Sequence, residues 1–350
     1  MKVNSHADIL PENKVYVIAE AGVNHNGDPA LARQLVRAAK EAGADCVKFQ
    51  TFSADQLVTV NAPKADYQLK VTNPKESQRD MLKRLELNPA AYQSLLAYCR
   101  ELNIDFLSTP YNEQDIIFLE NLGVNAFKVA SGQIVEPAFL TAVARTSRPI
   151  FLSTGMATLA EVDEAVRVIR AAGNDQITLL QCTTNYPSRL EDANLRTITK
   201  MSAAFDVAVG YSDHTQSDTA CLISIGLGAR VIEKHLTLDK AMPGPDQSSS
   251  ADPAEFANLV RLIREAELTL GTGRKEPCIA ELENCRGMRR SIVAARHIRA
   301  GEIFSLDMLH YKRPGTGIRP NLLPEILGCA ATRNIEADEL ISWSMCGRRQ

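Results

Sequence analysis

The sequence lacks the features that mark several large classes of protein. Its 350 residues contain no apolar run long enough to span a membrane, and the polar stretch 1–13 lacks the apolar core of a signal peptide. The formal net charge is only −3, which gives no sign of the basic excess that binds nucleic acid or an anionic membrane. We therefore expect a cytoplasmic protein whose partners include neither a nucleic acid nor a membrane.

Two signatures built on cysteine and glycine are also absent. The eight cysteines are scattered and form no CxxC pair, which is typical of buried free thiols in a reducing compartment. No GxGxxG turn follows a predicted strand, so the dinucleotide fingerprint of a doubly wound sheet is missing. A doubly wound sheet stays the alternative fold, although the sequence lacks its dinucleotide fingerprint.

The sequence does contain a regular alternation of short apolar segments and helical patterns. We predict strands at 16–21, 46–52, 105–109, 126–130, 149–153, 177–182, 206–211 and 231–236. The predicted helices that alternate with them cover 28–42, 89–103, 113–122, 136–147, 158–172, 194–204, 217–228 and 253–270. Eight β/α units over about 260 residues indicate an α/β fold of the closed (β/α)8 type, the TIM barrel.

Two segments interrupt this alternation. Residues 53–88 are long and polar, which predicts a lid or a binding loop that contains a short helix at 77–85. After a barrel domain at 1–270, residues 271–290 show little periodicity and are interpreted as a linker. Residues 291–350 then form a small second unit of short strands and turns, whose core must be thin.

Two histidines follow neighbouring strands of the predicted barrel. His214 ends the sequence YSDH, and His235 ends the sequence EKH. The active site of such a barrel lies at the carboxyl ends of its strands, and neutral imidazoles are common ligands of divalent metals. The two rings could therefore hold one ion, although each histidine could instead simply pack or hydrogen-bond in a loop.

Polar side chains recur at the ends of the other predicted strands. They are Glu20, Lys48, Gln50, Thr109, Lys128, Ser131, Ser153, Thr154, Thr183, Thr184, Ser212 and Asp213. Because alternate residues of a strand point to opposite faces, Lys48 and Gln50 should reach the same pocket. Two lysines among several hydroxyl groups suit a phosphate or a carboxylate. The serines and threonines could also serve only as helix N-caps.

Two further candidates lie outside the strand ends. Asp246 follows a Pro-Gly-Pro turn and could bind substrate hydroxyls or merely close the turn. Arg313 lies in a Pro-Gly turn of the small unit. It is a solvated surface residue unless that unit covers the mouth of a barrel.

Six motifs occur in an order that is specific in combination. They are GVNHNG (22–27), VKFQTF (47–52), LSTGMA (152–157), GYSDH (210–214), EKH (233–235) and KRPGTG (312–317). Together they resemble the bacterial sialic acid synthases, whose close relatives make legionaminic and pseudaminic acids. The resemblance runs over residues 14–341. It implies a TIM barrel followed by an antifreeze-like (SAF) domain, in a domain-swapped homodimer where that domain caps the partner's active site.

The same resemblance implies roles for individual residues. His214 and His235 would hold a divalent metal, manganese in the first place and magnesium or cobalt as alternatives, and Glu20 would line the amino-sugar site. A carboxyl group in a partly dry barrel mouth also makes Glu20 our candidate for proton handling. Phosphoenolpyruvate would be bound by Lys48, Thr109, Lys128, Ser131, Ser153, Thr184 and Ser212. The amino sugar would be bound by Gln50, Asn73, Gln133, Tyr186 and Asp246, with Arg313 arriving from the other subunit.

The implied activity is that of a transferase that forms a carbon–carbon bond. It condenses phosphoenolpyruvate with an N-acylated mannosamine, N-acetylmannosamine in the first place, to give a nonulosonic acid such as N-acetylneuraminate plus phosphate. Three positions depart from the pattern: Gln133 stands where some synthases have an acid, Thr184 where some have Asn, and Gln247 where many have His. The first and third leave open the same chemistry on a 2,4-diacetamido-2,4,6-trideoxyhexose, as in legionaminic or pseudaminic acid synthesis.

Two interpretations from other functional classes stay open on the residues alone. A lysine at a barrel strand end suits a Schiff-base aldolase, with Lys48 or Lys128 as the nucleophile. A protein that only binds carbohydrate, with residues 291–350 as the binding module, needs no catalytic group at all.

Overall fold

The structure, a computed structural model, describes residues 10–11 and 14–349. The chain divides into two compact units, Met1–Gly271 and Thr272–Gln350. Each unit has its own cluster of buried apolar side chains. The division lies one residue beyond the end of the predicted barrel domain 1–270.

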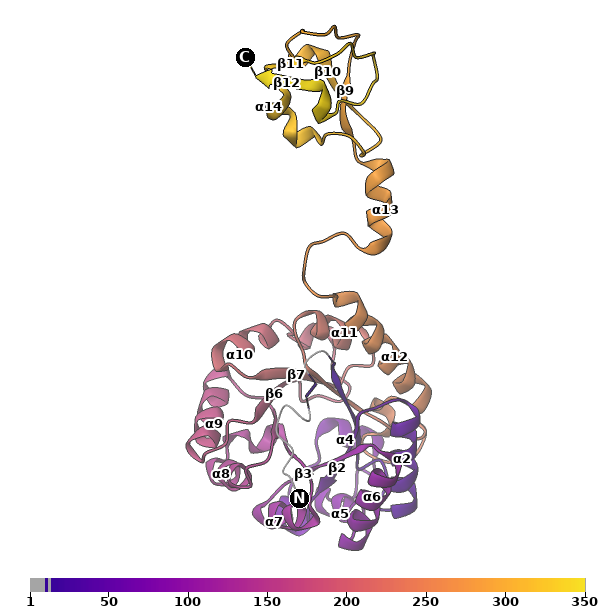
Figure 1. Cartoon of the computed structure of the whole chain (residues 1–350). Coiled ribbons are helices and arrows are strands. Elements are labelled where there is room, and N and C mark those ends of the chain that lie inside the picture. Colours follow the sequence, from indigo (N-terminus) through magenta and orange to yellow (C-terminus); the bar gives the residue numbers. More distant parts are fainter. Residues whose placement is uncertain (1–9, 12–13, 350) are drawn as a thin grey trace. The chain divides into compact units, whose positions relative to one another are not determined.

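The first unit is built on eight parallel strands, hydrogen-bonded in the order β3-β2-β1-β8-β7-β6-β5-β4. Their bounds are β1 Tyr16–Gly22, β2 Cys46–Thr51, β3 Asp105–Pro110, β4 Phe127–Val129, β5 Ile150–Ser153, β6 Ile177–Cys182, β7 Ala208–Asp213 and β8 Val231–His235. The two end strands of this order, β3 and β4, contact each other, so the sheet curves into a nearly closed barrel with helices around it (Figure 1). The predicted (β/α)8 barrel is confirmed.

Eight helices alternate with these strands. They are α2 Pro29–Glu41, α6 Pro89–Leu102, α7 Glu113–Leu122, α8 Pro137–Arg145, α9 Leu159–Ala171, α10 Thr197–Phe205, α11 Thr219–Gly226 and α12 Pro253–Leu270. Side-chain caps fix several starts: Asp28 accepts a hydrogen bond from the Ala30 amide, and Asp252 accepts one from the Glu255 amide. In both helices a proline occupies the first helical position, where no amide hydrogen is needed. The predicted helices at 194–204 and 217–228 are shorter or displaced by up to three residues.

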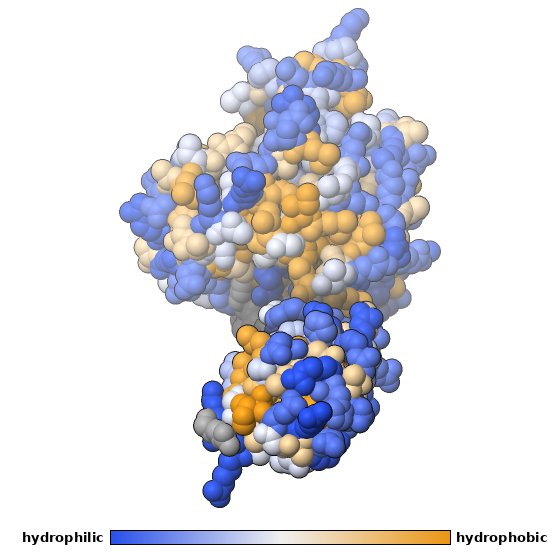
Figure 2. Space-filling view, turned by 90° about the horizontal axis from the view of Figure 1, so that it is seen from above, coloured by the Kyte–Doolittle hydropathy of each residue, from blue (hydrophilic) through white to orange (hydrophobic). Residues whose placement is uncertain are grey.

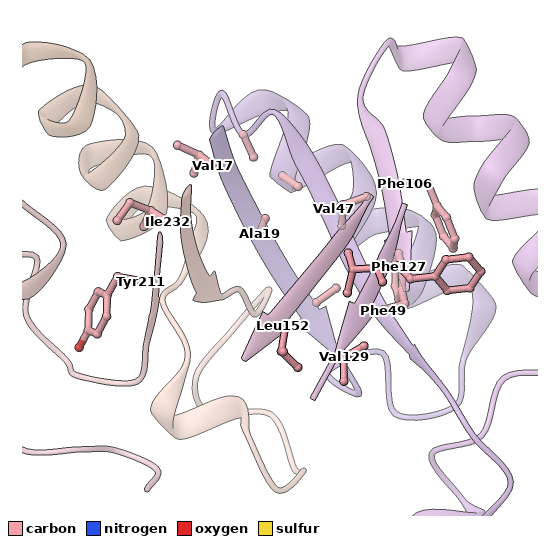
Figure 3. Close-up of a cluster of buried hydrophobic side chains, with 14 of the residues drawn as sticks. Val17, Ala19, Val47, Phe49, Phe106, Phe127, Val129, Leu152, Tyr211 and Ile232 are labelled. Carbon is pink, nitrogen blue, oxygen red and sulfur yellow. The ribbon is translucent and has the colours of Figure 1, made fainter. Parts of the chain in front are cut away.

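Alternation along the strands separates two apolar clusters. Val17 of β1 faces outward and belongs to the large core shared by strands and helices (Figure 3). Tyr16 and Ile18, its neighbours in sequence, belong to a smaller cluster inside the barrel. This interior is tightly filled, because a Cβ added to Gly210 would lie 2.6 Å from the Cβ of Val231. The inward series continues with polar residues towards the carboxyl ends of the strands.

The segment between β2 and α6 contains three short helices, α3 Ala54–Leu57, α4 Asp66–Val71 and α5 Gln78–Lys83. Only α5 corresponds to a predicted helix, the one expected at 77–85; α3 and α4 were not predicted. A buried ammonium holds the segment together: Lys64 Nζ donates to the carbonyl of Asn73 at 2.8 Å and to Thr72 Oγ1 at 3.0 Å. It also lies 3.2 Å from a carboxylate oxygen of Glu76.

The second unit begins with helix α13, Ile279–Met288. It then forms two antiparallel strand pairs and one further helix: β9 Ser291–Ala294 with β10 Leu309–Lys312, β11 Cys329–Ala331 with β12 Cys346–Arg349, and α14 Leu323–Ile326. On the face shown in Figure 2, hydrophilic residues predominate on this unit. Helix α13 lies within the predicted linker 271–290. It was not expected there, since none of its residues is buried and its sequence carries no clear apolar stripe.

No helix among the described residues is both long and apolar enough to cross a membrane.

Candidate active site

A cavity of about 620 Å³ lies at the carboxyl ends of the barrel strands. The sequence-predicted site residues that line it are Glu20, Lys48, Gln50, Thr109, Lys128, Ser131, Gln133, Ser153, Thr184, Tyr186, Ser212, His214, His235 and Asp246. They come from all eight β/α units, and alternation along the strands explains their convergence. After Tyr16 and Ile18, Glu20 is the next inward residue of β1, and it is paired in register with Lys48 on β2 and with His235 on β8.

Carboxylates and ammonium groups from four strands, β1, β2, β4 and β8, meet in the cavity. Lys48 Nζ lies 2.7 Å from Glu20 Oε2 and 3.8 Å from Glu233 Oε2. Lys128 Nζ lies 3.3 Å from Glu233 Oε1. All four side chains are buried, so each charge depends on its neighbours for compensation. Burial alone would raise the pKa of Glu233, but the two ammonium groups lower it to about 2.

Glu20 is held by neutral groups on its other side. Gln50 Nε2 donates to Glu20 Oε1 at 3.0 Å, and the Tyr111 hydroxyl donates to Gln50 Oε1 at 3.3 Å. Burial raises the pKa of Glu20, and the negative charge of Glu233 raises it as well. The ammonium group of Lys48 opposes both effects, but the pKa of Glu20 stays above its usual value. A carboxyl group with a raised pKa is suited to exchanging protons near neutral pH.

Another part of the cavity lining presents hydroxyl groups around a glycine turn. The Gly155 amide donates to Ser131 Oγ at 3.0 Å. A Cβ on Gly155 would lie only 2.3 Å from Thr184 Oγ1 and 2.7 Å from Ser131 Oγ, so this close approach requires glycine. Ser153 Oγ is buried and has no hydrogen-bond partner in the described part of the chain. An unpaired buried hydroxyl group lowers the stability of the fold. These hydroxyl groups therefore fit a ligand that offers several acceptor oxygens.

The two histidines lie together at the mouth of this cavity. Their ring centroids are 5.4 Å apart, and the Tyr186 ring packs against both. His214 Nδ1 lies 2.7 Å from the carbonyl oxygen of Thr183, which assigns the proton to Nδ1 and leaves Nε2 with a lone pair. Burial, followed by the charge of His214 and Lys48, holds the pKa of His235 well below its usual value.

This donor set fits a divalent cation. The His235 Nδ1 atom is buried without a hydrogen-bond partner among the described residues, and a neutral imidazole is the form that binds metal. Within the described ranges, no group of three or more His, Cys, Asp or Glu side chains is arranged to hold a metal ion. A cation on His214 and His235 would therefore take its other ligands from water or substrate.

Five predicted residues lie elsewhere. Thr154 Oγ1 donates to the Leu180 carbonyl at 3.0 Å, and Thr183 Oγ1 donates to the Asp192 carbonyl at 2.9 Å. Asn73 is exposed and does not line the cavity; its Oδ1 accepts from the Lys75 amide at 3.0 Å, which makes it a turn residue in this structure. Asp213 points to the outer side of the barrel wall, where it accepts from the Tyr211 hydroxyl at 3.0 Å. Arg313 is an exposed residue of the second unit, and its delivery from a partner subunit stays a prediction.

Several cavity residues were missed by sequence reasoning. Glu233 stands in the EKH motif, and its position two residues before His235 on the same strand face was a usable signal. Tyr111 follows β3 closely. Tyr67 comes from helix α4, and its ring lies 5.0 Å from that of Tyr186. Nothing in the polar segment 53–88 singled out this tyrosine.

Asp246 makes the stability of the protein depend on pH. Burial, then repulsion by Glu20, raises the pKa of Asp246 from 3.8 to about 6, against an opposing effect of His214. Because the folded pKa is the higher one, this group stabilises the fold fully below about pH 4. That contribution disappears as the pH rises through about 6, a change of up to about 3 kcal/mol.

We expect the Asp246→Asn substitution to remove this dependence, since asparagine does not titrate. Between pH 4.5 and pH 7.5, the wild type should lose about 2 kcal/mol of unfolding free energy that the variant does not lose. Urea unfolding of both proteins at the two pH values measures the difference. An equal difference at both pH values would show that Asp246 is not a buried, destabilised carboxylate.

The chain is similar to known proteins over most of its length. The chain matches the NeuB family over residues 35–275 and the SAF domain over residues 289–346. It is 44% identical over 330 residues to an N,N'-diacetyllegionaminic acid synthase of Campylobacter jejuni, covering 94% of this chain and 99% of that protein. It is also 44% identical over 332 residues to the enzyme of the same name from Legionella pneumophila, covering 94% and 93%.

A solved structure extends the likeness to three dimensions. The crystal structure of the N-acetylneuraminic acid (sialic acid) synthetase of Leptospira borgpetersenii has a TM-score of 0.69 with 31% sequence identity. The similarity covers 77% of this chain and 90% of that one. The resemblance read from the six motifs is thereby confirmed, and the chain belongs to the NeuB family and carries a SAF domain in its C-terminal unit.

Proposed function

We propose that this protein condenses phosphoenolpyruvate with an N-acylated amino sugar to give a nonulosonic acid and phosphate. One observation carries the proposal: two buried lysines, a set of hydroxyl groups and two adjacent imidazoles face the same cavity. The lysines and hydroxyls suit a small ligand with a phosphate and a carboxylate. The imidazoles suit a divalent cation beside it.

For the acceptor we favour a 2,4-diacetamido-2,4,6-trideoxyhexose over N-acetylmannosamine. The two relatives at 44% identity are both named N,N'-diacetyllegionaminic acid synthase. Gln133, which lines the cavity, offers a neutral amide where some sialic acid synthases have an acid. An amide can both donate to and accept from a second acylamino group.

Each reaction step can be assigned to residues of this chain. A divalent cation held by His214 and His235 would supply Lewis-acid polarisation of the sugar aldehyde; manganese is our first choice, and magnesium or cobalt are alternatives. The enol carbon of phosphoenolpyruvate forms a bond to the aldehyde carbon, and the aldehyde oxygen takes a proton, for which Glu20 is placed as donor. Water adds to the carbon that bears phosphate and gives up one proton, which restores that of Glu20. The bond from this carbon to the bridging oxygen then breaks, so that a ketone remains and phosphate leaves with its bridging oxygen and the second proton of the water.

The two lysines stabilise the charge that accumulates during this sequence. Lys48 and Lys128 are buried, and a charged contact in a poorly hydrated site is stronger than the same contact in water. Thr109 Oγ1 lies 3.2 Å from Lys48 Nζ and helps to orient it. Phosphate therefore departs from a site whose positive groups are already in place.

Phosphate release from phosphoenolpyruvate with a panel of amino sugars tests the proposal. We expect release that requires both a divalent metal and a sugar, fastest with the 2,4-diacetamido acceptor. Inhibition by borohydride through a trapped sugar or pyruvate adduct, with no effect of chelators, would instead support a Schiff-base aldolase. No phosphate release with any acylated sugar of the panel would leave only a carbohydrate-binding role.

We further propose that the enzyme is a domain-swapped homodimer in which Arg313 acts on the partner's cavity. A mixture of two inactive variants, Arg313→Ala and His214→Ala, tests this directly. In a mixed dimer, the intact barrel of the Arg313→Ala chain would receive Arg313 from the intact SAF domain of the His214→Ala chain. We expect reassociated mixtures to recover up to about a quarter of the wild-type activity. Two variants that stay inactive after mixing, although mixed dimers are shown to form, would contradict action in trans.

A further inference from the structure

Glu233 is the most highly connected carboxylate of the cavity, yet neither the sequence prediction nor the proposed reaction assigns it a role. Its Oε1 accepts from Ser212 Oγ at 2.9 Å and lies 3.3 Å from Lys128 Nζ. Its Oε2 lies 3.8 Å from Lys48 Nζ. All three partners are groups that we expect to hold phosphoenolpyruvate. Glu233 thus touches three members of one binding set at once.

Two buried ammonium groups that line the same cavity would repel each other without an anion between them. Lys48 has Glu20 at 2.7 Å as its main counterion. For Lys128, the one salt bridge in the described part of the chain is with Glu233. A buried lysine that loses its only counterion either changes position or loses its charge. The position of Lys128 therefore depends on Glu233.

The strand register explains how Glu233 reaches these groups. Ser212 on β7 and Glu233 on β8 are paired residues of adjacent parallel strands, and both point inward. Glu233 precedes His235 by two residues on the same face, so it lies one inward position deeper than that imidazole. The carboxylate is thus attached to a rigid strand.

We propose that Glu233 is a positioning residue of the phosphoenolpyruvate site, which fixes Lys48, Lys128 and Ser212 in the arrangement that receives the ligand's anionic groups. The inference rests on the proposed function and deepens it. An ammonium group has three N–H donors, and Glu233 engages Lys128 through one oxygen only. Donors of Lys128 therefore remain available to phosphate and carboxylate oxygens, whereas Lys48 already contacts Glu20 and Thr109 and has at most one further donor to offer.

The opposite role is also conceivable, because a carboxylate among phosphate-binding groups can compete with the ligand and repel it. The two roles predict opposite results for Glu233→Gln, which removes the charge and keeps the shape. A positioning residue predicts weaker binding of phosphoenolpyruvate, whereas a competitor predicts tighter binding. Calorimetric titration of the manganese-loaded full-length enzyme with phosphoenolpyruvate, in the absence of sugar, distinguishes them.

We expect Glu233→Gln to weaken phosphoenolpyruvate binding by roughly 30- to 300-fold, the range for loss of a buried charged contact. The KM for the sugar should change by less than about threefold, because the hydrogen bond and salt bridges of Glu233 within the described residues go to Ser212, Lys48 and Lys128. Glu233→Asp keeps the charge and should restore part of the affinity. Its retained charge also gives a usable variant if the glutamine variant does not fold.

Glu267→Gln is a matched control. Glu267 Oε1 accepts from the Val15 amide and from Arg264 Nη1 at 2.7 Å, next to the start of β1 and therefore at the other end of the barrel. Its substitution should lower thermal stability and leave phosphoenolpyruvate affinity unchanged. Unchanged or tighter binding in Glu233→Gln, or equal effects of the two glutamine variants, would overturn the inference. A wild-type enzyme that binds no phosphoenolpyruvate would instead overturn the proposed function.

Discussion

The His214→Ala variant is expected to lose high-affinity binding of manganese and to release phosphate at least about a thousand times more slowly than the wild type. The reason is structural: the Thr183 carbonyl fixes the Nδ1 proton of His214, so that Nε2 is the atom available to a cation. The 5.4 Å separation from the His235 ring leaves room for one shared ion. Within the described residues no third side chain completes a metal-binding group, so nothing in this set compensates for the loss.

Two measurements test this expectation independently. Electron paramagnetic resonance of added Mn²⁺ reports the bound fraction without requiring turnover, and a phosphate assay reports the rate. His297→Ala is the control, since His297 is exposed and lies near Glu336 in the second unit; it should leave manganese binding unchanged. A His214→Ala enzyme with normal metal binding and metal-dependent turnover would refute the assignment.

Replacement of Lys128 by methionine is expected to lower kcat/KM for phosphoenolpyruvate by about two to three decades, or roughly 3–4 kcal/mol of transition-state stabilisation. Methionine keeps much of the buried volume but removes the ammonium that faces Glu233 at 3.3 Å. The carboxylate then keeps only Ser212 and the more distant Lys48. Because a buried charge is left short of partners, the unfolding free energy should also fall.

Steady-state kinetics with phosphoenolpyruvate varied at saturating sugar measure the effect. Lys200→Met, at an exposed position of α10, is the control for loss of a lysine from the surface, and it should behave as the wild type. If Lys128→Met kept a normal kcat/KM, the buried charged groups around Lys128 would not form the phosphoenolpyruvate site. The choice between phosphate and carboxylate as the partner of Lys128 does not affect this result.

The sequence predicted the barrel and the inward strand-end residues of the cavity because both depend on local alternation. A strand buried on both sides shows itself as a short apolar run, and the barrel rule then places the next inward polar residue at the mouth. Glu20, Lys48 and His235 follow directly from this rule. Ser212 and His235 point into the barrel, so strict alternation along β7 and β8 would have excluded Asp213 from the predicted site. It would also have included Glu233.

Residues outside the strands could not be predicted in the same way. The conformation of segment 53–88 is fixed by tertiary contacts such as those of buried Lys64, which leave no periodic pattern in the sequence. Tyr67 therefore appears at the cavity only in the structure, while Asn73 lies in an exposed turn. The N-terminal residues 1–9 and 12–13 lie outside the described ranges.

The fate of solvent oxygen tests the central claim most directly. If the enzyme joins phosphoenolpyruvate to an aldehyde, and water then adds to the carbon that bears phosphate, the carbon–oxygen bond breaks and phosphate keeps its bridging oxygen. In H₂¹⁸O with the preferred amino sugar, mass spectrometry should find released phosphate free of solvent ¹⁸O, in equal amount to a new 2-keto acid. Phosphate that carries one solvent ¹⁸O, without a condensed product, would show attack at phosphorus and contradict the account.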